Sequence, residues 1–513
     1  MHPKTRLILA LFALVPASVA FAQRPPALYP DTTPVLSLDG LRKVTLPNTT
    51  IESVALNEAE GSVRVTAIVT HPPAKDRVTV WVALPLKDWN GRFQGNGGGG
   101  FSGGNPASLR GPIALGFATA ATDAGHEGGS GAFALNANGR LNWQEIRDFG
   151  YLGIHAMTVV GKALATAFYG KPPRYSYFVG GSQGGRQGLT EAQRYPEDYD
   201  GIVSRCPAVS WQHSIATSMW PQVVMLEAGH FVSPAKFAAV TAAVIAACDA
   251  DDGVKDGVID DPLRCTWDPQ ALVGTQVGEE IFGEADADVV RKIWGGPRAH
   301  DGRPLWFALP RGASFLTVAA TEGTPLRGKP YGTALDRLRY MLAQNPNWDW
   351  TTLTRAEFEL FVNQSVEAFG AVMGSDNPDL TGFRERGGKL LILHGLADQT
   401  LPSQGTVAYY ERVRARMGGV AKTAEFARLF LVPGVDHGFR GAGASPDQRA
   451  QLAALIAWVE EGRAPDRLIG EVKDKDGKVI RTRPLFPYPQ FAKYRGTGSP
   501  DDAANFIAAT PAK

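Results

Sequence analysis

The sequence predicts an α/β fold with a mainly parallel sheet and a large insertion. Three apolar runs at residues 175–179, 389–394 and 426–432 are typical of strands buried on both faces. Each run ends in a glycine-containing turn. From about residue 211 to 378, by contrast, helical patterns and seven tryptophans replace core-type strands. The sheet therefore begins before this region and resumes after it.

Composition limits the function classes. The chain has 513 residues, so two or more structural units are expected. Apolar residues make up 44% of the chain, which is enough for a substantial core. The 52 basic and 51 acidic residues give a net charge of +1. This balance argues against binding of nucleic acid or of an anionic membrane.

The N-terminus predicts an export signal. Lys4 and Arg6 precede an apolar stretch at residues 7–20, and Ala20-Phe21-Ala22 supplies small residues for cleavage. The apolar stretch is short for a membrane anchor, and no later segment is expected to span a bilayer. The signal would occupy residues 1–22, and the mature protein would be periplasmic or secreted.

The first catalytic candidate is Ser182. Its surroundings read Gly-Gly-Ser-Gln-Gly-Gly after the strand at 175–179 and before a helix at 186–194. A Gly-x-Ser-x-Gly turn between strand and helix is typical of the nucleophile elbow of an α/β-hydrolase. The turn forces the serine backbone into a strained conformation that requires small neighbours. The alternative is a glycine-rich turn that happens to contain serine.

The acid and the base of a serine hydrolase follow the nucleophile in the order Asp, His. Asp398 comes just after the strand at 389–394, and His437 follows the strand at 426–432. The three strand ends are expected at one edge of the sheet, where open α/β sheets bind ligands. Three alternatives compete with these two residues. Asp436 reads as a turn residue, His394 as a core histidine, and His126 as a structural or cleft-lining residue.

A glycine-rich loop follows the early strands at 62–70 and 78–84. Residues 95–101 contain five glycines, which let backbone N–H groups approach a ligand closely. A serine hydrolase takes one N–H of its oxyanion hole from such a loop. No Lys-Ser/Thr follows, so a P-loop is not indicated. The alternative is a loop without function.

The chain therefore divides into an expected signal and two structural units. Residues 23–210 and 378–513 form the α/β-hydrolase core, and residues 211–377 form an inserted lid. Such insertions cover the cleft and shape the substrate pocket. Some aromatic residues of the lid are candidates for stacking on a substrate ring, although most are expected to form its own core.

An acidic loop lies within the lid. Residues 249–260 carry five aspartates, whose carboxylates repel one another unless a cation neutralises them. Closely spaced hard oxygen ligands suit Ca²⁺. The spacing is not that of an EF-hand, and the alternative is a solvated acidic loop. Cys248 and Cys265 flank the loop and are the natural pair for a disulfide, which leaves Cys206 as a buried, unpaired thiol.

Taken together, four stretches resemble the tannase/feruloyl esterase family. They are residues 89–101, 177–189, 248–260 and 426–437, and the tail at 481–490 is similar as well. The resemblance implies an α/β-hydrolase core, a lid with a structural Ca²⁺, and hydrolysis of esters of aromatic acids. It implies these roles: Ser182, Asp398 and His437 as the triad; the N–H groups of Gly100 and Gln183 as the oxyanion hole; Asp249, Asp252 and Asp256 with the carbonyls of Val254 and Val258 around calcium; and Cys248 bonded to Cys265.

One departure from the family pattern concerns a disulfide beneath the active site. The family usually has Cys directly before the nucleophile and directly after the catalytic histidine. Here these positions are Gly181 and Gly438. Phe486 likewise stands where relatives have a tail cysteine. Because both partners under the active site are replaced together, we expect a lost crosslink and not a lost function.

The sequence thus predicts a periplasmic or secreted serine esterase that acts through an acyl-enzyme on small aromatic esters. Binding of nucleic acid is not expected, nor is membrane attachment after signal removal. One alternative is an esterase or acyltransferase of the same fold that uses a non-aromatic ester. Another is a binding protein that keeps the fold without catalysis.

Overall fold

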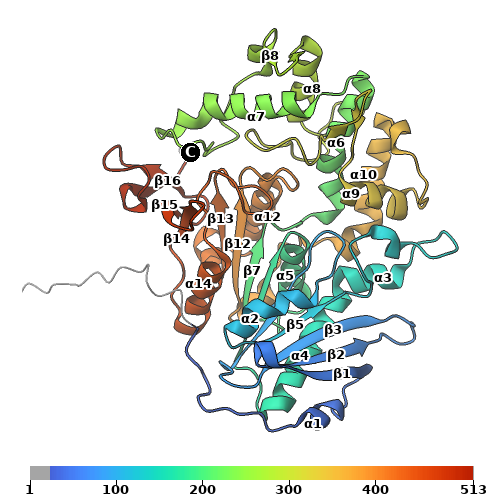
Figure 1. The fold of residues 1–513 in the computed structure, drawn as a ribbon, viewed down its shortest axis with the longest axis vertical. Coiled ribbons are helices and arrows are strands. Elements are labelled where there is room, and N and C mark those ends of the chain that lie inside the picture. Colours follow the sequence, from blue (N-terminus) through green and yellow to red (C-terminus); the bar gives the residue numbers. More distant parts are fainter. Residues whose placement is uncertain (1–23, 512–513) are drawn as a thin grey trace, which may run out of the picture.

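The computed structural model describes residues 24–511, so the expected signal at 1–22 lies outside the described residues. Its centre is a nine-stranded mixed sheet with the order β1-β2-β3-β5-β4-β6-β7-β12-β13 (Figure 1). The first four strands in this order pair antiparallel, and the remaining pairs are parallel. The strands are β1 (Thr49–Asn57), β2 (Ser62–Val69), β3 (Val78–Pro85), β4 (Arg92–Asn96), β5 (Ala118–Thr122), β6 (Tyr175–Gly181), β7 (Gly201–Arg205), β12 (Lys389–Gly395) and β13 (Ala427–Val432).

Helices cover both faces of this sheet, which explains the unbroken apolar runs of its parallel strands. In β12, Leu390 and Ile392 pack into one core, whereas Leu391 and Leu393 pack into a core on the other face. The first core receives α4 (Gly153–Tyr169), α5 (Gln183–Arg194) and α12 (Ser403–Arg416), and the second receives α14 (Gln448–Glu461). The predicted α/β-hydrolase fold with a mainly parallel sheet is confirmed.

The edge strand β1 is not among the strands expected from the sequence. Its side chains are mostly exposed, and only Val54 is buried. A strand with one buried side chain gives almost no period-two signal. Its pairing with β2 is therefore a product of the tertiary fold.

The segment from residue 211 to 377, here called the inserted segment, is mainly helical. Figure 1 places it over one end of the parallel strands. Its longer helices are α6 (Ser214–Ala228), α7 (Pro234–Cys248), α8 (Glu284–Trp294) and α10 (Arg355–Met373). Its strands, β8 to β11, have two residues each. It has a hydrophobic core of its own, but Phe101, Ala124 and Phe149 of the preceding chain belong to the same core.

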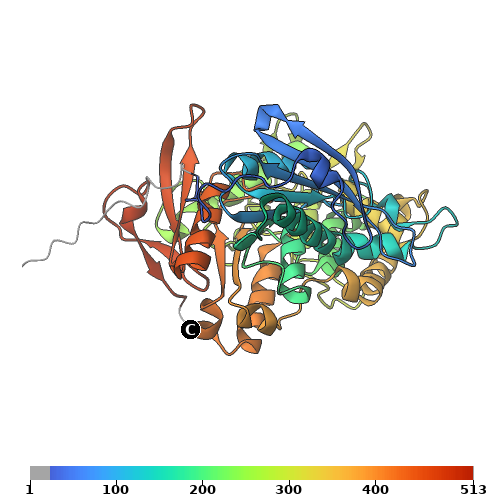
Figure 2. The same ribbon diagram turned by 90° about the horizontal axis from the view of Figure 1, so that it is seen from below.

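The C-terminal strands lie beside the β13 edge of the sheet, far from β1 (Figure 2). They form two hairpins, β14 (Leu468–Lys473) with β15 (Val479–Leu485) and β16 (Phe491–Tyr494) with β17 (Phe506–Ala509). A bridge between Phe430 and Pro487 fixes the tail to β13.

Among residues 24–511, one helical stretch has the length and apolarity that a membrane span needs, although the sequence predicts none beyond the signal. It is Trp143–Tyr169, and 56% of its most apolar window is buried. Its main helix, α4, packs on β3 and β5. The apolar surface is therefore explained by the core of the sheet.

Candidate active site

Ser182 occupies a strained turn between β6 and α5. Its backbone has φ 58° and ψ −119°, a region that residues with a side chain rarely adopt. The turn is tight enough that a Cβ on Gly180 would lie 2.3 Å from the carbonyl oxygen of Gly184. The Ser182 N–H donates to the carbonyl of Arg205 at 2.9 Å, which ties the turn to the neighbouring strand β7. Gly180 therefore cannot carry a side chain unless the backbone of the turn moves.

The structure brings Ser182, His437 and Asp398 together. His437 Nε2 lies 2.9 Å from Ser182 Oγ, and His437 Nδ1 lies 2.7 Å from Asp398 Oδ2. The other oxygen of Asp398 accepts hydrogen bonds from the N–H groups of Thr400 at 2.8 Å and Leu401 at 2.7 Å. This is the geometry in which a histidine can take the proton of a serine while a carboxylate orients the ring.

The charges of the pair stabilise a protonated histidine. Burial alone would lower the pKa of His437, but the negative charge and hydrogen bond of Asp398 raise it well above 6.5. Burial alone would raise the pKa of Asp398, yet the charge of His437 and the hydrogen bonds of His394 and His437 hold it below its usual range. The carboxylate therefore stays ionised, as the orienting group of a triad must.

The three alternatives from the sequence have other positions. Asp436 accepts the N–H of Arg440 at 2.9 Å in a turn. His126 Nε2 contacts the carbonyl of Phe101 at 2.6 Å, so it supports the glycine-rich loop. His394 is buried as expected, with Nδ1 2.8 Å from Thr406 Oγ1. Its Nε2, however, also lies 3.1 Å from Asp398 Oδ2, a contact that the sequence did not suggest.

Cys206 is a second residue near the site that sequence reasoning missed. The sequence predicts a small buried residue at this position. Cys206 is buried, but its Sγ also lies 3.4 Å from the carbonyl oxygen of His437. Its sulfur, a nitrogen of His437 and an oxygen of Asp398 all lie within 4.8 Å of one another. The order of strands in the sheet explains the position of Cys206, because β7 lies between β6 and β12. The residue after β7 must then lie between the nucleophile and the acid.

The glycine-rich loop packs directly on the nucleophile turn. The Gly184 N–H donates to the Gly98 carbonyl at 3.0 Å, and a Cβ on Gly97 would lie 2.5 Å from Gly184 Cα. Gly100 and Gln183 line the same pocket as Ser182. Within residues 24–511, neither of their backbone N–H groups has a hydrogen-bond acceptor in the protein. Both are thus available to a ligand oxygen.

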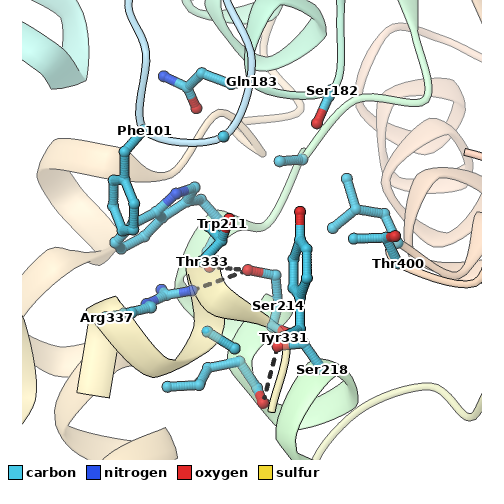
Figure 3. Close-up of a pocket in the computed structure, with 15 residues that line it drawn as sticks. Phe101, Ser182, Gln183, Trp211, Ser214, Ser218, Tyr331, Thr333, Arg337 and Thr400 are labelled. Carbon is cyan, nitrogen blue, oxygen red and sulfur yellow. Dashed lines mark hydrogen bonds between the residues drawn. The ribbon is translucent and has the colours of Figure 1, made fainter. Parts of the chain in front are cut away.

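A pocket opens at Ser182 between the sheet and the inserted segment (Figure 3). Its aromatic walls are Phe101, Trp211 and Tyr331, and Arg337 lies on the side away from Ser182. The remaining lining residues are small or polar, apart from the aliphatic Ile215 and Leu401: Gly100, Gln183, Ala208, Ser214, Ile215, Ser218, Thr333, Ala334, Thr400 and Leu401. Ser182 therefore stands at a pocket with three aromatic walls.

The acidic loop is folded around Asp249. One oxygen of Asp249 accepts the N–H groups of Asp256, Gly257 and Val258 at 2.9, 2.8 and 3.2 Å. The disulfide between Cys248 and Cys265, which the sequence predicted, closes this loop.

The carboxylates of this loop fit a cation. Desolvation and the charge of the neighbouring Asp252 raise the pKa of Asp260 to about 8. Two adjacent carboxyl groups of this kind are stabilised by a hard cation with oxygen ligands. Asp256 is additionally paired with Arg481 and Arg483 of β15. Neither the arginines nor Asp260 were in the ligand set expected from the sequence.

Comparisons with known proteins extend over nearly the whole chain. A family model described as "Tannase and feruloyl esterase" matches residues 63–509. A probable feruloyl esterase of Arthroderma benhamiae is 40% identical over 478 residues, 90% of this chain and 87% of its own. The mono(2-hydroxyethyl) terephthalate hydrolase of Piscinibacter sakaiensis is 32% identical over 498 residues, 83% of this chain and 80% of its own.

A solved structure is also similar over nearly the whole chain. Feruloyl esterase B from Aspergillus oryzae superposes with a TM-score of 0.79 at 27% sequence identity, and the match covers 92% of this chain and 100% of that chain. The family match at residues 63–509 spans the sheet from β2 onward, the inserted segment and the tail.

Proposed function

Because the chain is a carboxylic ester hydrolase that belongs to the tannase and feruloyl esterase family, we propose that its substrates are small esters of aromatic carboxylic acids. The observation that carries this proposal is the hydrogen-bonded series Ser182, His437 and Asp398 at the mouth of a pocket with aromatic walls. Aromatic side chains favour a ring by stacking and by burial of apolar surface.

Ser182 is the nucleophile in this proposal. As its Oγ bonds to the ester carbonyl carbon, His437 Nε2 takes the hydroxyl proton and becomes an imidazolium. The ionised Asp398 stabilises that cation through Nδ1. The carbonyl oxygen becomes an oxyanion, which accepts hydrogen bonds from the free N–H groups of Gly100 and Gln183. The strained backbone of Ser182 holds its hydroxyl at this point before substrate arrives.

The intermediate then loses its alcohol. The bond between the carbonyl carbon and the alcohol oxygen breaks, and His437 gives its proton to that oxygen. The acyl group remains on Ser182. Water attacks the acyl carbon, again losing a proton to His437, and the proton returns to Ser182 Oγ when the acid leaves. Each cycle consumes one ester and one water and produces one acid and one alcohol.

Calcium is part of the proposal as a structural ion. Asp249, Asp252 and Asp256, with the carbonyls of Val254 and Val258, would hold it in the acidic loop. Bound there, the ion would supply positive charge to clustered carboxylates and would take no part in the reaction. The disulfide at this loop and the signal-like N-terminus support a periplasmic or secreted location.

The test is hydrolysis of matched esters by the purified mature chain. We expect turnover of methyl ferulate and methyl gallate at a kcat/KM well above that of methyl butyrate. Ser182→Ala should lower kcat by several orders of magnitude, because the nucleophile is lost while the fold is kept. Ser108→Ala, a change of the same type in the short helical turn Pro106–Leu109 outside the pocket lining, is the control and should keep full activity.

Three results would contradict the proposal. A higher kcat/KM for methyl butyrate than for the two aromatic esters would favour the alternative of a non-aromatic substrate. Equal activity of Ser182→Ala and the parent chain on every ester would remove Ser182 from the reaction, and no turnover of any ester would leave a binding protein.

A further inference from the structure

Arg205 lies between the turn that carries Ser182 and the loop that carries His437. It is the last residue of β7 and stands opposite Gly181 of β6 in the pairing of the two strands. Its carbonyl accepts the Ser182 N–H at 2.9 Å. The backbone of Arg205 is therefore fixed beside the nucleophile, and its side chain starts from a defined point.

The side chain of Arg205 folds over Gly181. A Cβ on Gly181 would lie 3.4 Å from Arg205 Nη2 and 3.7 Å from both Cβ and Cζ of the arginine. The two ends of the arginine side chain thus lie against the same glycine. The φ angle of Gly181 is not positive, so its backbone does not call for glycine. What the missing side chain provides is the space that the guanidinium fills.

The guanidinium reaches two segments that follow β13. Its carbon lies 5.5 Å from the ring centroid of Phe439, two residues after His437. Gln448, the first residue of α14, has its amide oxygen toward the guanidinium and accepts from Nη2 at 2.7 Å and from Nη1 at 2.9 Å. Between residues 24 and 511 no carboxylate forms an ion pair with Arg205, and burial lowers its pKa. Stacking and one amide therefore hold the side chain in place.

Strand pairing alone does not fix the distance between Ser182 and His437. β7 and β12 lie between β6 and β13 in the sheet, and both residues stand on turns beyond their strands. Asp398, which follows β12, orients the ring of His437 through Nδ1. Arg205 contacts the turn of Ser182 on one side and the loop of His437 on the other. A side chain in contact with both can fix the 2.9 Å separation of His437 Nε2 and Ser182 Oγ.

We propose that Arg205 is a positioning residue for the esterase reaction: through Phe439 it holds His437 against Ser182, so that their hydrogen bond exists before substrate arrives. Proton transfer to His437 depends on this arrangement when the acyl-enzyme forms and when water breaks it. The inference rests on the proposed roles of Ser182 and His437 and adds the residue that sets their distance. Arg205, Phe439 and Gln448 do not line the pocket, so substrate binding should not depend on them.

The experiment separates the chemical steps from binding. Arg205→Met keeps the length of the side chain and removes the planar cation. We expect kcat for methyl ferulate to fall at least tenfold and KM to change less than threefold, because a misplaced base slows proton transfer while the pocket is intact. Inactivation of Ser182 by phenylmethylsulfonyl fluoride should also slow at least tenfold, since it needs the same proton transfer. Arg205→Lys keeps the charge without the planar stack and should have an intermediate kcat.

Arg428→Met is the matched control. Arg428 is also half-buried, with its guanidinium carbon 5.4 Å from the ring centroid of Trp458, and it donates to two carbonyls. It lies at the start of β13, at the opposite end of the strand from His437. This variant should keep kcat and the inactivation rate within threefold of the parent, even where its melting temperature falls as far as that of Arg205→Met. An equal loss of kcat in both variants would show an effect of stability alone and would overturn the inference.

A further variant tests the contact with Phe439. Phe439→Leu should also lower kcat, and the double variant with Arg205→Met should have a kcat within threefold of Arg205→Met alone, because both changes break one contact. Phe439→Leu decides the question if Arg205→Met does not fold. A folded single variant with the parental kcat, or losses that multiply in the double variant, would overturn the inference, while an inactive Ser182→Ala leaves the proposed function standing. Parental activity of Ser182→Ala would remove both.

Discussion

At the scale of single residues, Asp398 is the best-anchored group of the site. Both of its oxygens accept hydrogen bonds, one from backbone N–H groups and the other from His437 and His394. Such a carboxylate cannot rotate, so the ring of His437 has one preferred orientation. The same contacts keep Asp398 ionised and favour the protonated form of His437.

The rise of activity with pH should report the pKa of His437 as it is raised by Asp398. Catalysis needs neutral His437, and Asp398 raises the pKa of His437 above 6.5. We therefore expect log kcat/KM to rise with pH through an apparent pKa higher than 6.5 and then to level off. Asp398→Asn removes the negative charge, so the apparent pKa should fall and kcat should fall with it.

The measurement is a profile of kcat/KM between pH 5 and 9 with a neutral ester. Asp436→Asn, next to the histidine but facing a turn, is the matched control and should leave the apparent pKa unchanged. A parent profile whose apparent pKa lies below 6.5 would contradict the assigned charge coupling.

The sequence predicted that Ser182, Asp398 and His437 lie together, because each follows a strand of recognisable pattern. Ser182, Asp398 and His437 needed only the rule that parallel strands end at one edge. Cys206 and His394 were not connected with the site, because their contacts depend on the order of strands in the sheet. Arg205 carries no motif at all, and its contact with Phe439 is visible only after folding.

At the scale of elements, the acidic loop joins the inserted segment to the C-terminal tail. Arg481 and Arg483 of β15 reach Asp256 from more than two hundred positions along the chain. The sequence predicted the disulfide and the acidic cluster from local spacing. It did not predict the arginines, because a contact at that separation leaves no local pattern.

Removal of calcium should destabilise this element. An ion that binds only the folded state adds about 2.7 kcal/mol to the free energy of unfolding at a hundred times its dissociation constant. We expect a chelator to lower the melting temperature, and added Ca²⁺ to restore it. Asp252→Asn should weaken the response, whereas Asp251→Asn, an exposed neighbour outside the expected ligand set, should not.

Elemental analysis of undialysed protein completes this test. Protein without calcium whose melting temperature ignores both chelator and added Ca²⁺ would show that the arginines alone neutralise the loop.

At the scale of the whole molecule, the active site is assembled from segments far apart in the chain. Ser182 and His437 are 255 positions apart and form a hydrogen bond. The glycines beside them, Gly181 and Gly438, stand where the family usually has a disulfide. Neither has a positive φ, so neither position requires glycine for its backbone. A Cβ would meet its nearest neighbours at 3.4 Å and 3.3 Å respectively.

Restoring the crosslink should stabilise the protein. Gly181→Cys with Gly438→Cys would close a loop of more than 250 residues, and loop-closure entropy puts the gain at about 3–5 kcal/mol when strain is small. The variant is made with Cys206→Ala, because that thiol lies close enough to compete. The measurement is the free energy of unfolding in urea for the oxidised and reduced forms.

The Cys206→Ala parent, oxidised and reduced in the same way, is the control and should show no difference. Two free thiols after oxidation of the double variant would mean that the glycines are too far apart or misdirected for a bond.

Residues 211–377 share one hydrophobic core with Phe101, Ala124 and Phe149. The inserted segment is therefore difficult to exchange for that of a relative. A graft of this segment from a relative would meet the wrong partners on the glycine-rich loop and on the chain before α4. Those same residues position Gly100 and one wall of the pocket. A chimera that is meant to change specificity must therefore carry residues 101–149 along with the insertion, and natural divergence of the two stretches is constrained to proceed jointly.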